Sequence, residues 1–186
     1  MRISPLGVWA ASDPARAAGA AREDSALTHP NPVCVDACAA YAAAIATAVA
    51  GGSREDTLHA ALGQARELKV VEAIRNGAAG KAPEDFITHQ GWVLIALQNA
   101  FWQLFSSPGV EEALVRTVGF GGDTDTNAAI AGALLGAVDG RGAFPSRWIL
   151  PLLACRPLAA AGVRRPRPST YWPDDVFDLA EALLQK

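Results

Sequence analysis

The stretch that decides the fold reads GGDTDTNAAIAGALLGAV and covers residues 121–138. It begins with a glycine pair, and small residues recur along the rest of it, at Ala129, Gly132, Ala133, Gly136 and Ala137. Small side chains at helical spacing let the backbone of one helix approach another closely. The pattern therefore predicts a glycine loop followed by a helix in a crowded core.

Helix signals continue on both sides of this stretch, whereas alternating runs of β-branched residues are nearly absent. Residues 13–14 and 31–32 are each an N-cap residue followed by proline, and Ser53 with Asp56 resembles a capping box. The helices expected from such signals cover residues 13–23, 33–50, 53–74, 92–105, 110–118, 123–138, 146–154 and 174–185. They predict an all-α fold, an orthogonal multi-helix bundle of about nine helices in a single domain over residues 1–186.

Two segments between these helices have a different composition. Residues 76–82 contain glycine and polar residues and predict a loop, after which the acidic residues 83–85 resemble the first turn of a helix. Residues 164–168 alternate arginine with proline and predict an extended connector.

Composition excludes several classes of partner. The chain has 186 residues, of which 51% are hydrophobic and 19% are charged, and this mixture favours a folded domain over disorder. A formal charge of −3 gives no global positive field, so nucleic acid is not an expected partner. The apolar runs at residues 39–50 and 128–138 are shorter than the roughly 20 residues of a spanning helix, and residues 1–11 are a poor secretory signal. We therefore expect a cytoplasmic protein without a membrane segment.

The three cysteines, Cys34, Cys38 and Cys155, form no C-x-x-C pair that would indicate a zinc or redox site. Cys34 and Cys38 are four residues apart and share one face of the predicted helix. Free cysteines are commonly buried as small hydrophobic side chains, and this is the expectation here.

The chemistry-bearing residues follow the glycine pair. In an extended loop side chains alternate, so Asp123 and Asp125 would point to the same side and meet the Thr126 hydroxyl. Such hard oxygen ligands suit Mg²⁺ or Mn²⁺. Gly121 and Gly122 would let a ligand approach the backbone where the helix begins. The alternative is that the aspartates only cap the helix, which explains one of them but neither the second nor the paired glycines.

Residues 121–137, GGDTDTNAAIAGALLGA, resemble the C-terminal metal motif of the ADP-ribosylglycohydrolases, the family of the dinitrogenase-reductase-activating glycohydrolases and the ADP-ribosylarginine hydrolases. Further stretches resemble the family in the same order. They are MRISPLG at residues 1–7, SALTHP at 25–30, HQGWVL at 89–94 and FPSRW at 144–148.

The resemblance implies an all-α fold whose site holds two Mg²⁺ or Mn²⁺ ions and cleaves the bond between ADP-ribose and an acceptor, commonly an arginine nitrogen. It implies that Asp123 and Asp125 are catalytic and that these two residues and Thr126 are metal ligands, with Asp125 bridging both ions. The implied substrate-binding residues are His29, Gly121, Gly122 and Trp92, with His29 near the phosphates and Trp92 stacked on a base or ribose. The alternatives are a capping histidine and a plain core tryptophan.

Two segments typical of the family, Gly-Asp-x-x-Gly and Thr-Asp-Asp, have no counterpart in this sequence, where the one Asp-Asp pair is Asp174-Asp175 after Pro173. We therefore expect an N-terminally truncated member that binds metal weakly by itself. Two hypotheses follow. The chain is either the C-terminal part of an enzyme that an N-terminal partner fragment completes, or a non-catalytic remnant that self-associates and binds ADP-ribose weakly or not at all.

Overall fold

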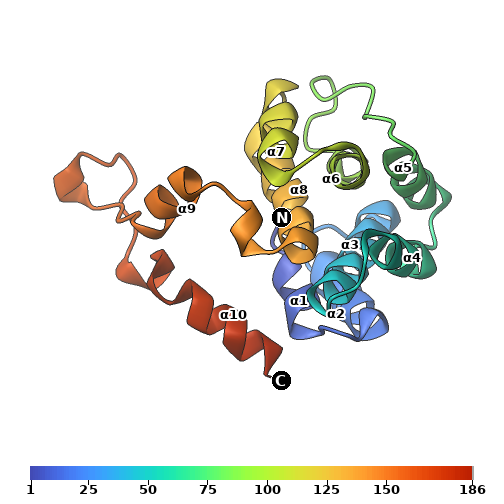
Figure 1. Ribbon diagram of the computed structural model, residues 1–186, viewed down its shortest axis with the longest axis horizontal. Helices are drawn as coiled ribbons and strands as arrows, with labels where there is room; N and C mark the ends of the chain where they lie inside the picture. Colours follow the sequence, from blue (N-terminus) through green and yellow to red (C-terminus); the bar gives the residue numbers. More distant parts are fainter. Residues whose placement is uncertain (186) are drawn as a thin grey trace.

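The computed structural model describes residues 1–185. These residues form ten α-helices and four short 3₁₀ turns, joined by loops and with no strand among them (Figure 1). The α-helices are α1 Ser4–Trp9, α2 Pro14–Ala26, α3 Pro32–Val49, α4 Arg54–Gln64, α5 Leu68–Ala78, α6 Val93–Ser106, α7 Val110–Gly119, α8 Thr124–Asp139, α9 Ser146–Leu153 and α10 Val176–Leu184. The prediction of an all-α bundle is confirmed. Figure 1 views α6 along its axis while α8 lies in the plane of the picture, so these two contacting helices cross steeply.

The central helix is α3, which α1, α2, α4, α6 and α8 all contact. Eleven of its 18 residues are buried, and eight of those eleven are alanines. Alanine combines high helix propensity with little bulk, so several helices can approach the same segment. The approach of α1 is close enough that a Cβ on Gly7 would lie 2.6 Å from the Cβ of Ile45.

α3 is also the one helix among residues 1–185 that is long and apolar enough to cross a membrane by length and composition. In the fold, 61% of it is buried by the surrounding helices. Central helices of globular bundles have the same composition, because they are covered on every side.

Two polar side chains fix α3 to its neighbours. The buried hydroxyl of Tyr41 donates a hydrogen bond of 2.8 Å to the backbone carbonyl of Ile130 in α8, and burial raises the pKa of this tyrosine. The carboxylate of Asp36 is only 4% exposed and lies 3.2 Å from the guanidinium of Arg22 in α2. A buried carboxylate needs such partners because its desolvation is otherwise unfavourable.

The prediction of one helix over residues 53–74 is wrong, because the chain turns at residues 65–67, between α4 and α5. Oδ2 of Asp36 accepts hydrogen bonds from the backbone amides of Arg66 and Glu67, at 2.7 and 2.8 Å. Arg22 donates to the carbonyl of Gln64, at 2.6 Å. These tertiary bonds replace the helical ones at the break. The capping box of Ser53 and Asp56 at the start of α4 is confirmed.

The loop expected at residues 76–82 begins later, and the acidic residues 83–85 start no helix. α5 runs on through Gly77, and the connection to α6 is a loop over residues 79–92. Asp85 closes a tight turn in this loop by accepting hydrogen bonds from the amides of Ile87 and Thr88, both at 2.8 Å. Hydrogen bonding from Thr88, with a smaller contribution from Ile87, lowers the pKa of Asp85 to about 2.

The small residues of α8 face side chains. A Cβ on Gly132 would meet Leu114 of α7 at 3.5 Å, and one on Gly136 would meet Phe144 at 3.1 Å. Gly132 therefore faces another helix, α7, as expected, through a leucine side chain, whereas Gly136 makes room for the aromatic ring of Phe144, which lies outside the helices.

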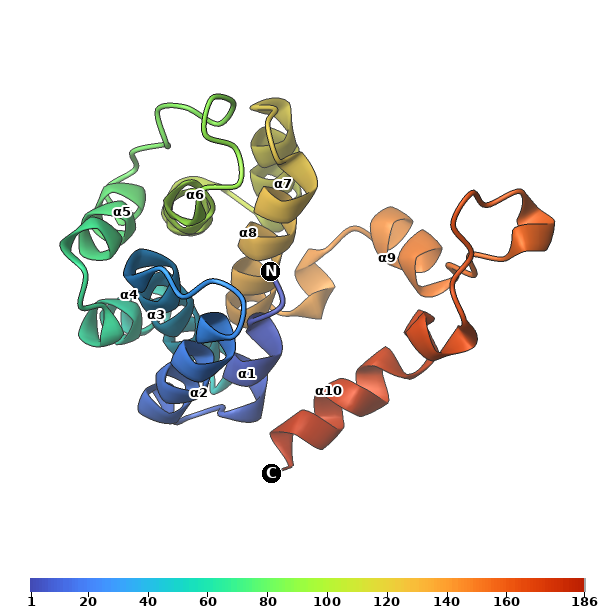
Figure 2. The ribbon, with the colours of Figure 1, turned by 180° about the vertical axis from the view of Figure 1, so that it is seen from behind.

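Residues 145–185, here called the C-terminal arm, lie beside the remaining helices in both views (Figures 1 and 2). The arm holds α9 and α10, and its residues 164–168 are irregular, as predicted for a connector. It returns to the body where α10 contacts α1 and where the guanidinium of Arg141 lies 4.3 Å from the ring centre of Phe177.

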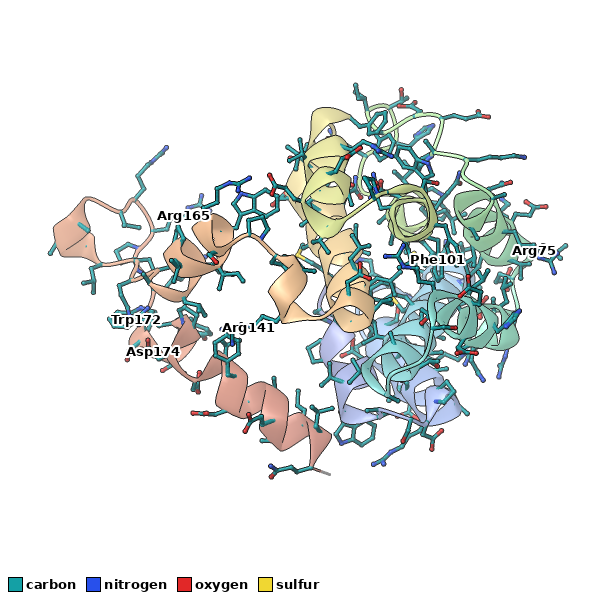
Figure 3. All side chains as sticks on the ribbon, in the orientation of Figure 1. Arg75, Phe101, Arg141, Arg165, Trp172 and Asp174 are labelled. Atoms are coloured by element: carbon teal, nitrogen blue, oxygen red, sulfur yellow. The ribbon has the colours of Figure 1, made fainter. Side chains whose placement is uncertain are left out.

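Figure 3 places Phe101 among the packed helices and Arg165, Trp172 and Asp174 on the arm, where Arg156 pairs with Asp174. The exposed apolar side chains of the arm include Leu150, Leu152, Phe177, Leu179 and Leu184.

Gly77 offers a test of the packing between α5 and α6. A Cβ there would lie 2.5 Å from the carbonyl oxygen of Gln98, which is backbone and cannot rotate away. We expect Gly77→Ala to destabilise the fold, because overpacking costs about 1–3 kcal/mol and exceeds the gain of up to about 1 kcal/mol from helix propensity. Thermal unfolding followed by circular dichroism measures the change, at about 2–4 °C per kcal/mol.

Gly63 is a matched control, since Gly63 and Gly77 are each the penultimate residue of an 11-residue helix. Nothing lies within 4 Å of a Cβ on Gly63, so Gly63→Ala should raise the Tm. Equal increases in both variants would contradict the close contact between α5 and α6.

Candidate functional site

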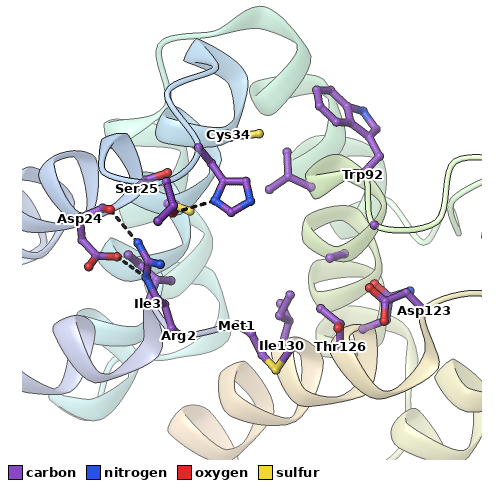
Figure 4. A pocket seen from close by; sticks show the side chains of 17 residues that line it. Met1, Arg2, Ile3, Asp24, Ser25, Cys34, Trp92, Asp123, Thr126 and Ile130 are labelled. Atoms are coloured by element: carbon purple, nitrogen blue, oxygen red, sulfur yellow. Dashed lines mark hydrogen bonds and ion pairs between the residues drawn. The ribbon is translucent and has the colours of Figure 1, made fainter.

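A cavity of about 420 Å³ lies where α8 begins, opposite the connection between α2 and α3 (Figure 4). Its volume is in the range of about 300–1,000 Å³ that is usual for small-molecule sites. The lining side chains come from segments far apart in the sequence: Arg2, Asp24, Ser25, Thr28, His29, Cys34, Cys38, Trp92, Asp123, Thr126 and Asn127 are among them.

One face of α8 forms a wall of this cavity. Asp123, Thr126, Asn127 and Ile130 line it, and their spacing of three, four and seven residues is that of one helix face. Asp123 is the N-cap residue, but its side chain makes no capping hydrogen bond. Figure 4 shows Asp123 and Thr126 side by side at the cavity, across from Ser25 and Cys34. The carboxylate is therefore available to a ligand, and the capping alternative does not describe it.

Of the two aspartates expected to converge, Asp123 lines the cavity and Asp125 does not. α8 begins at Thr124, so Asp123 is its N-cap residue and Asp125 lies in its first turn, and the two are not in the extended loop that was expected. Asp125 is exposed and does not line the cavity. Its role as a metal ligand stays a prediction.

The donors on α8 suit part of a metal site. A carboxylate and a hydroxyl, from Asp123 and Thr126, are the hard oxygen donors that Mg²⁺ and Mn²⁺ prefer. Within residues 1–185, however, no three His, Cys, Asp or Glu side chains lie close enough together to hold a metal ion. The described residues thus offer two hard oxygen donors at this cavity, and a role for them in metal binding stays a prediction.

The glycine pair has a packing role. Gly121 and Gly122 have φ values of +77° and +70°, as the loop interpretation expected of glycines. A Cβ on Gly122 would lie 1.9 Å from the carbonyl oxygen of Phe86, so the start of α8 sits directly against the loop over residues 79–92. Neither glycine is among the residues that line the cavity, and their contact with a nucleotide stays a prediction.

Ser25 and His29 line the cavity near the junction of α2 and α3. Ser25 is 3% exposed, and its hydroxyl oxygen has no hydrogen-bond partner among the described residues. Buried hydroxyls are normally paired, so this one is a candidate for bonding to a ligand. His29 is exposed, and its Nδ1 lies 2.8 Å from the Thr28 hydroxyl, which leaves Nε2 free to meet a ligand.

Ser25 is a candidate that sequence reasoning missed. Its segment was matched to the family, but an unpaired hydroxyl becomes visible only when the surrounding structure is known. Arg2 was missed for the same reason. It donates to the carboxylate of Asp24 at 2.9 Å and to the Asp24 carbonyl at 2.8 Å, and the pair lies beside the cavity.

Trp92 lies between this cavity and a second, neighbouring cavity. It is 37% exposed, and it lines both the first cavity and a neighbouring one of about 430 Å³ beneath the loop over residues 79–92. His89 lines only the second cavity. The position of Trp92 allows its ring to contact a ligand in the first cavity, while the stacking role itself stays a prediction.

Comparison with known proteins agrees with the resemblance. The sequence model of the ADP-ribosylglycohydrolase family matches residues 1–185. A protein of Pseudomonas putida strain GB-1 described as ADP-ribosylarginine hydrolase Tri1 is 30% identical over 125 residues, which are 67% of this chain and 33% of that protein. An uncharacterized protein of Archaeoglobus fulgidus is 31% identical over 157 residues, which are 80% of this chain and 50% of that protein.

The chain therefore spans a third to a half of the length of these curated relatives. The family match itself extends over almost every residue, including the start of α8 and the segment around Ser25 and His29. On this evidence the chain belongs to the ADP-ribosylglycohydrolase family.

Proposed function

We propose that this chain forms part of the active site of an ADP-ribosylglycohydrolase, which hydrolyses the glycosidic bond between ADP-ribose and an arginine side chain of a protein. The observation that carries the proposal is the Asp123 carboxylate, which makes no capping bond and faces a cavity of ligand size. The arginine acceptor is supported by the description of the Pseudomonas relative as an ADP-ribosylarginine hydrolase.

In this proposal the cavity holds ADP-ribose. The hydroxyls of Ser25 and Thr126 and the amide of Asn127 would hydrogen-bond its ribose and phosphate oxygens, because all three line the cavity. His29 would contact the phosphates, and Trp92 would stack on a base or ribose from the opposite wall. The apolar lining from Ile3, Val93 and Ile130 would exclude water from the bound sugar.

The proposed metal ligands are Asp123, Asp125 and Thr126, joined by carboxylates from a segment outside residues 1–186. Asp125 suits such a shared site because it is exposed on the first turn of α8, beside the cavity residues and not within their face. When bound, two Mg²⁺ or Mn²⁺ ions would supply activation of a water molecule for attack on the anomeric carbon. The side chain of Asp123 would orient the reacting ribose at the N-terminus of α8.

A second candidate function is a non-catalytic module that self-associates or joins a partner and binds ADP-ribose weakly. It is favoured by the lack of any three-residue metal-binding group within residues 1–185. The two candidates share the cavity and differ in whether Asp123 and Asp125 support turnover.

Ligand binding can be tested through Ser25. If its unpaired hydroxyl bonds ADP-ribose, Ser25→Ala loses one hydrogen bond of about 0.5–1.5 kcal/mol, and affinity falls about two- to tenfold. Isothermal titration calorimetry of the chain with ADP-ribose measures this change. The matched control is Thr57→Val, since Thr57 also has a buried hydroxyl without a partner among the described residues and does not line the cavity. Equal affinity in wild type and Ser25→Ala would exclude Ser25 from the site.

Turnover can be tested by reconstitution. The chain alone should release little ADP-ribose from an ADP-ribosylated arginine substrate in the presence of Mg²⁺ or Mn²⁺, because its ligand set is incomplete. Adding an N-terminal fragment of a relative that carries Thr-Asp-Asp should restore release. Asp123→Asn and Asp125→Asn should then each lower the rate by more than about 100-fold, because each removes a ligand charge.

Asp178→Asn is the control for this experiment, since Asp178 is an exposed aspartate of α10 in the C-terminal arm. Its variant should reconstitute fully. Strong hydrolysis by the unassisted chain, or full activity of the Asp125→Asn mixture, would refute the proposed division of the metal site.

A further inference from the structure

We propose that Cys34 and Cys38 form a dithiol site in the cavity wall that binds a soft, thiophilic cation or a trivalent arsenical. Both cysteines are free, both are half-buried, and both line the cavity of about 420 Å³. They were expected to be buried as small hydrophobic side chains. Cys38 does pack partly against the core, but each thiol also borders the cavity, which gives solutes a route to the pair.

The helix brings the two thiols within chelating reach. Cys34 and Cys38 are four residues apart on the regular helix α3, where side chains at this spacing have Cβ atoms about 5–6 Å apart. Two thiolates that share one tetrahedral ion with bonds of about 2.3 Å have sulfurs about 3.8 Å apart. Rotation about χ1 on each residue closes the difference, and solvent in the cavity supplies the remaining ligands.

The electrostatics of the pair agree with this arrangement. Burial raises the pKa of the Cys34 thiol, and the neighbouring Cys38 raises it further. The raised pKa keeps the Cys34 thiol protonated near neutral pH, and a cation that binds the pair releases the thiol protons as it forms two metal–sulfur bonds.

The site is chemically distinct from the opposite wall of the cavity. Figure 4 shows Cys34 facing the cavity from α3, with Asp123 and Thr126 across from it on α8. Thiolates select soft ions such as Cu(I) or Cd²⁺, whereas the carboxylate and hydroxyl of α8 suit hard ions such as Mg²⁺. A soft ion at Cys34 and Cys38 therefore does not depend on the proposed hydrolase function.

The decisive experiment titrates the full chain with Cd²⁺ under reducing, ligand-free conditions and follows the ultraviolet absorption of cadmium–thiolate bonds. We expect one Cd²⁺ per chain with the absorption of two thiolates. Cys34→Ser and Cys38→Ser should each weaken binding at least tenfold and lose the two-thiolate signal. Cys155→Ser is the matched control, since Cys155 is exposed on the C-terminal arm, and it should bind like wild type.

A second measurement uses the unmodified chain and so does not depend on how the variants fold. Phenylarsine oxide condenses with two thiols, forming two arsenic–sulfur bonds and releasing water. It should protect Cys34 and Cys38 together from alkylation, as seen by peptide mass spectrometry, and leave Cys155 reactive. A signal that follows Cys155, one ion per two chains, or alkylation of Cys34 and Cys38 despite the arsenical would overturn the proposal.

Discussion

Close approach to an alanine-lined helix is the constraint on which the other elements depend. Because α3 has eight buried alanines, the helices around it can contact it without long side chains in between. Such contacts leave little tolerance for added volume, since protein interiors are packed at crystal-like density. Glycines at the closest approaches, such as Gly7 against Ile45, follow from the same requirement.

The same helix also positions the candidate site. Its first turns place Cys34 and Cys38 in the cavity wall, and Tyr41, further along, binds the carbonyl of Ile130 in α8. That bond connects α3 to the helix whose N-terminus carries Asp123. Asp36, which lies between Cys34 and Cys38 in the chain, ties α2 and the start of α5 to α3. The core and the cavity are thus parts of a single arrangement.

Local signals in the sequence were sufficient to predict where a helix begins when the residues at its own end determine that position. The proline starts of α2 and α3, the capping box of α4 and the glycine loop before α8 were all predicted correctly. The break between α4 and α5 could not be predicted in this way, because its cause is Asp36, about 30 residues earlier in the chain. The family was found from short motifs, and the match over residues 1–185 confirms it.

The site was predicted less completely than the fold. Asp123 and Thr126 line the same cavity, but an extended loop was assumed for Asp125 where a helix had already begun. The error lay in the backbone geometry assumed for Asp125, an extended chain in place of a helix, and not in the choice of residues. The place of Ser25 and Arg2 in the site depends on contacts between distant segments, and no local sequence pattern indicates such contacts.

The position of the C-terminal arm has a consequence for how charge is distributed over the molecule. Residues 140–173 contain six arginines and no acidic residue, whereas residues 1–139 contain nine basic and fifteen acidic residues. The net charge of −3 therefore combines an arginine-rich segment, most of which lies beside the body, with acidic stretches on both sides of it in the sequence. Attraction between exposed charges is screened beyond about 8 Å at physiological salt. The arginine-rich part of the arm is followed by four acidic residues, Asp174, Asp175, Asp178 and Glu181, so attraction to the acidic body acts on only part of the arm and weakens as ionic strength rises.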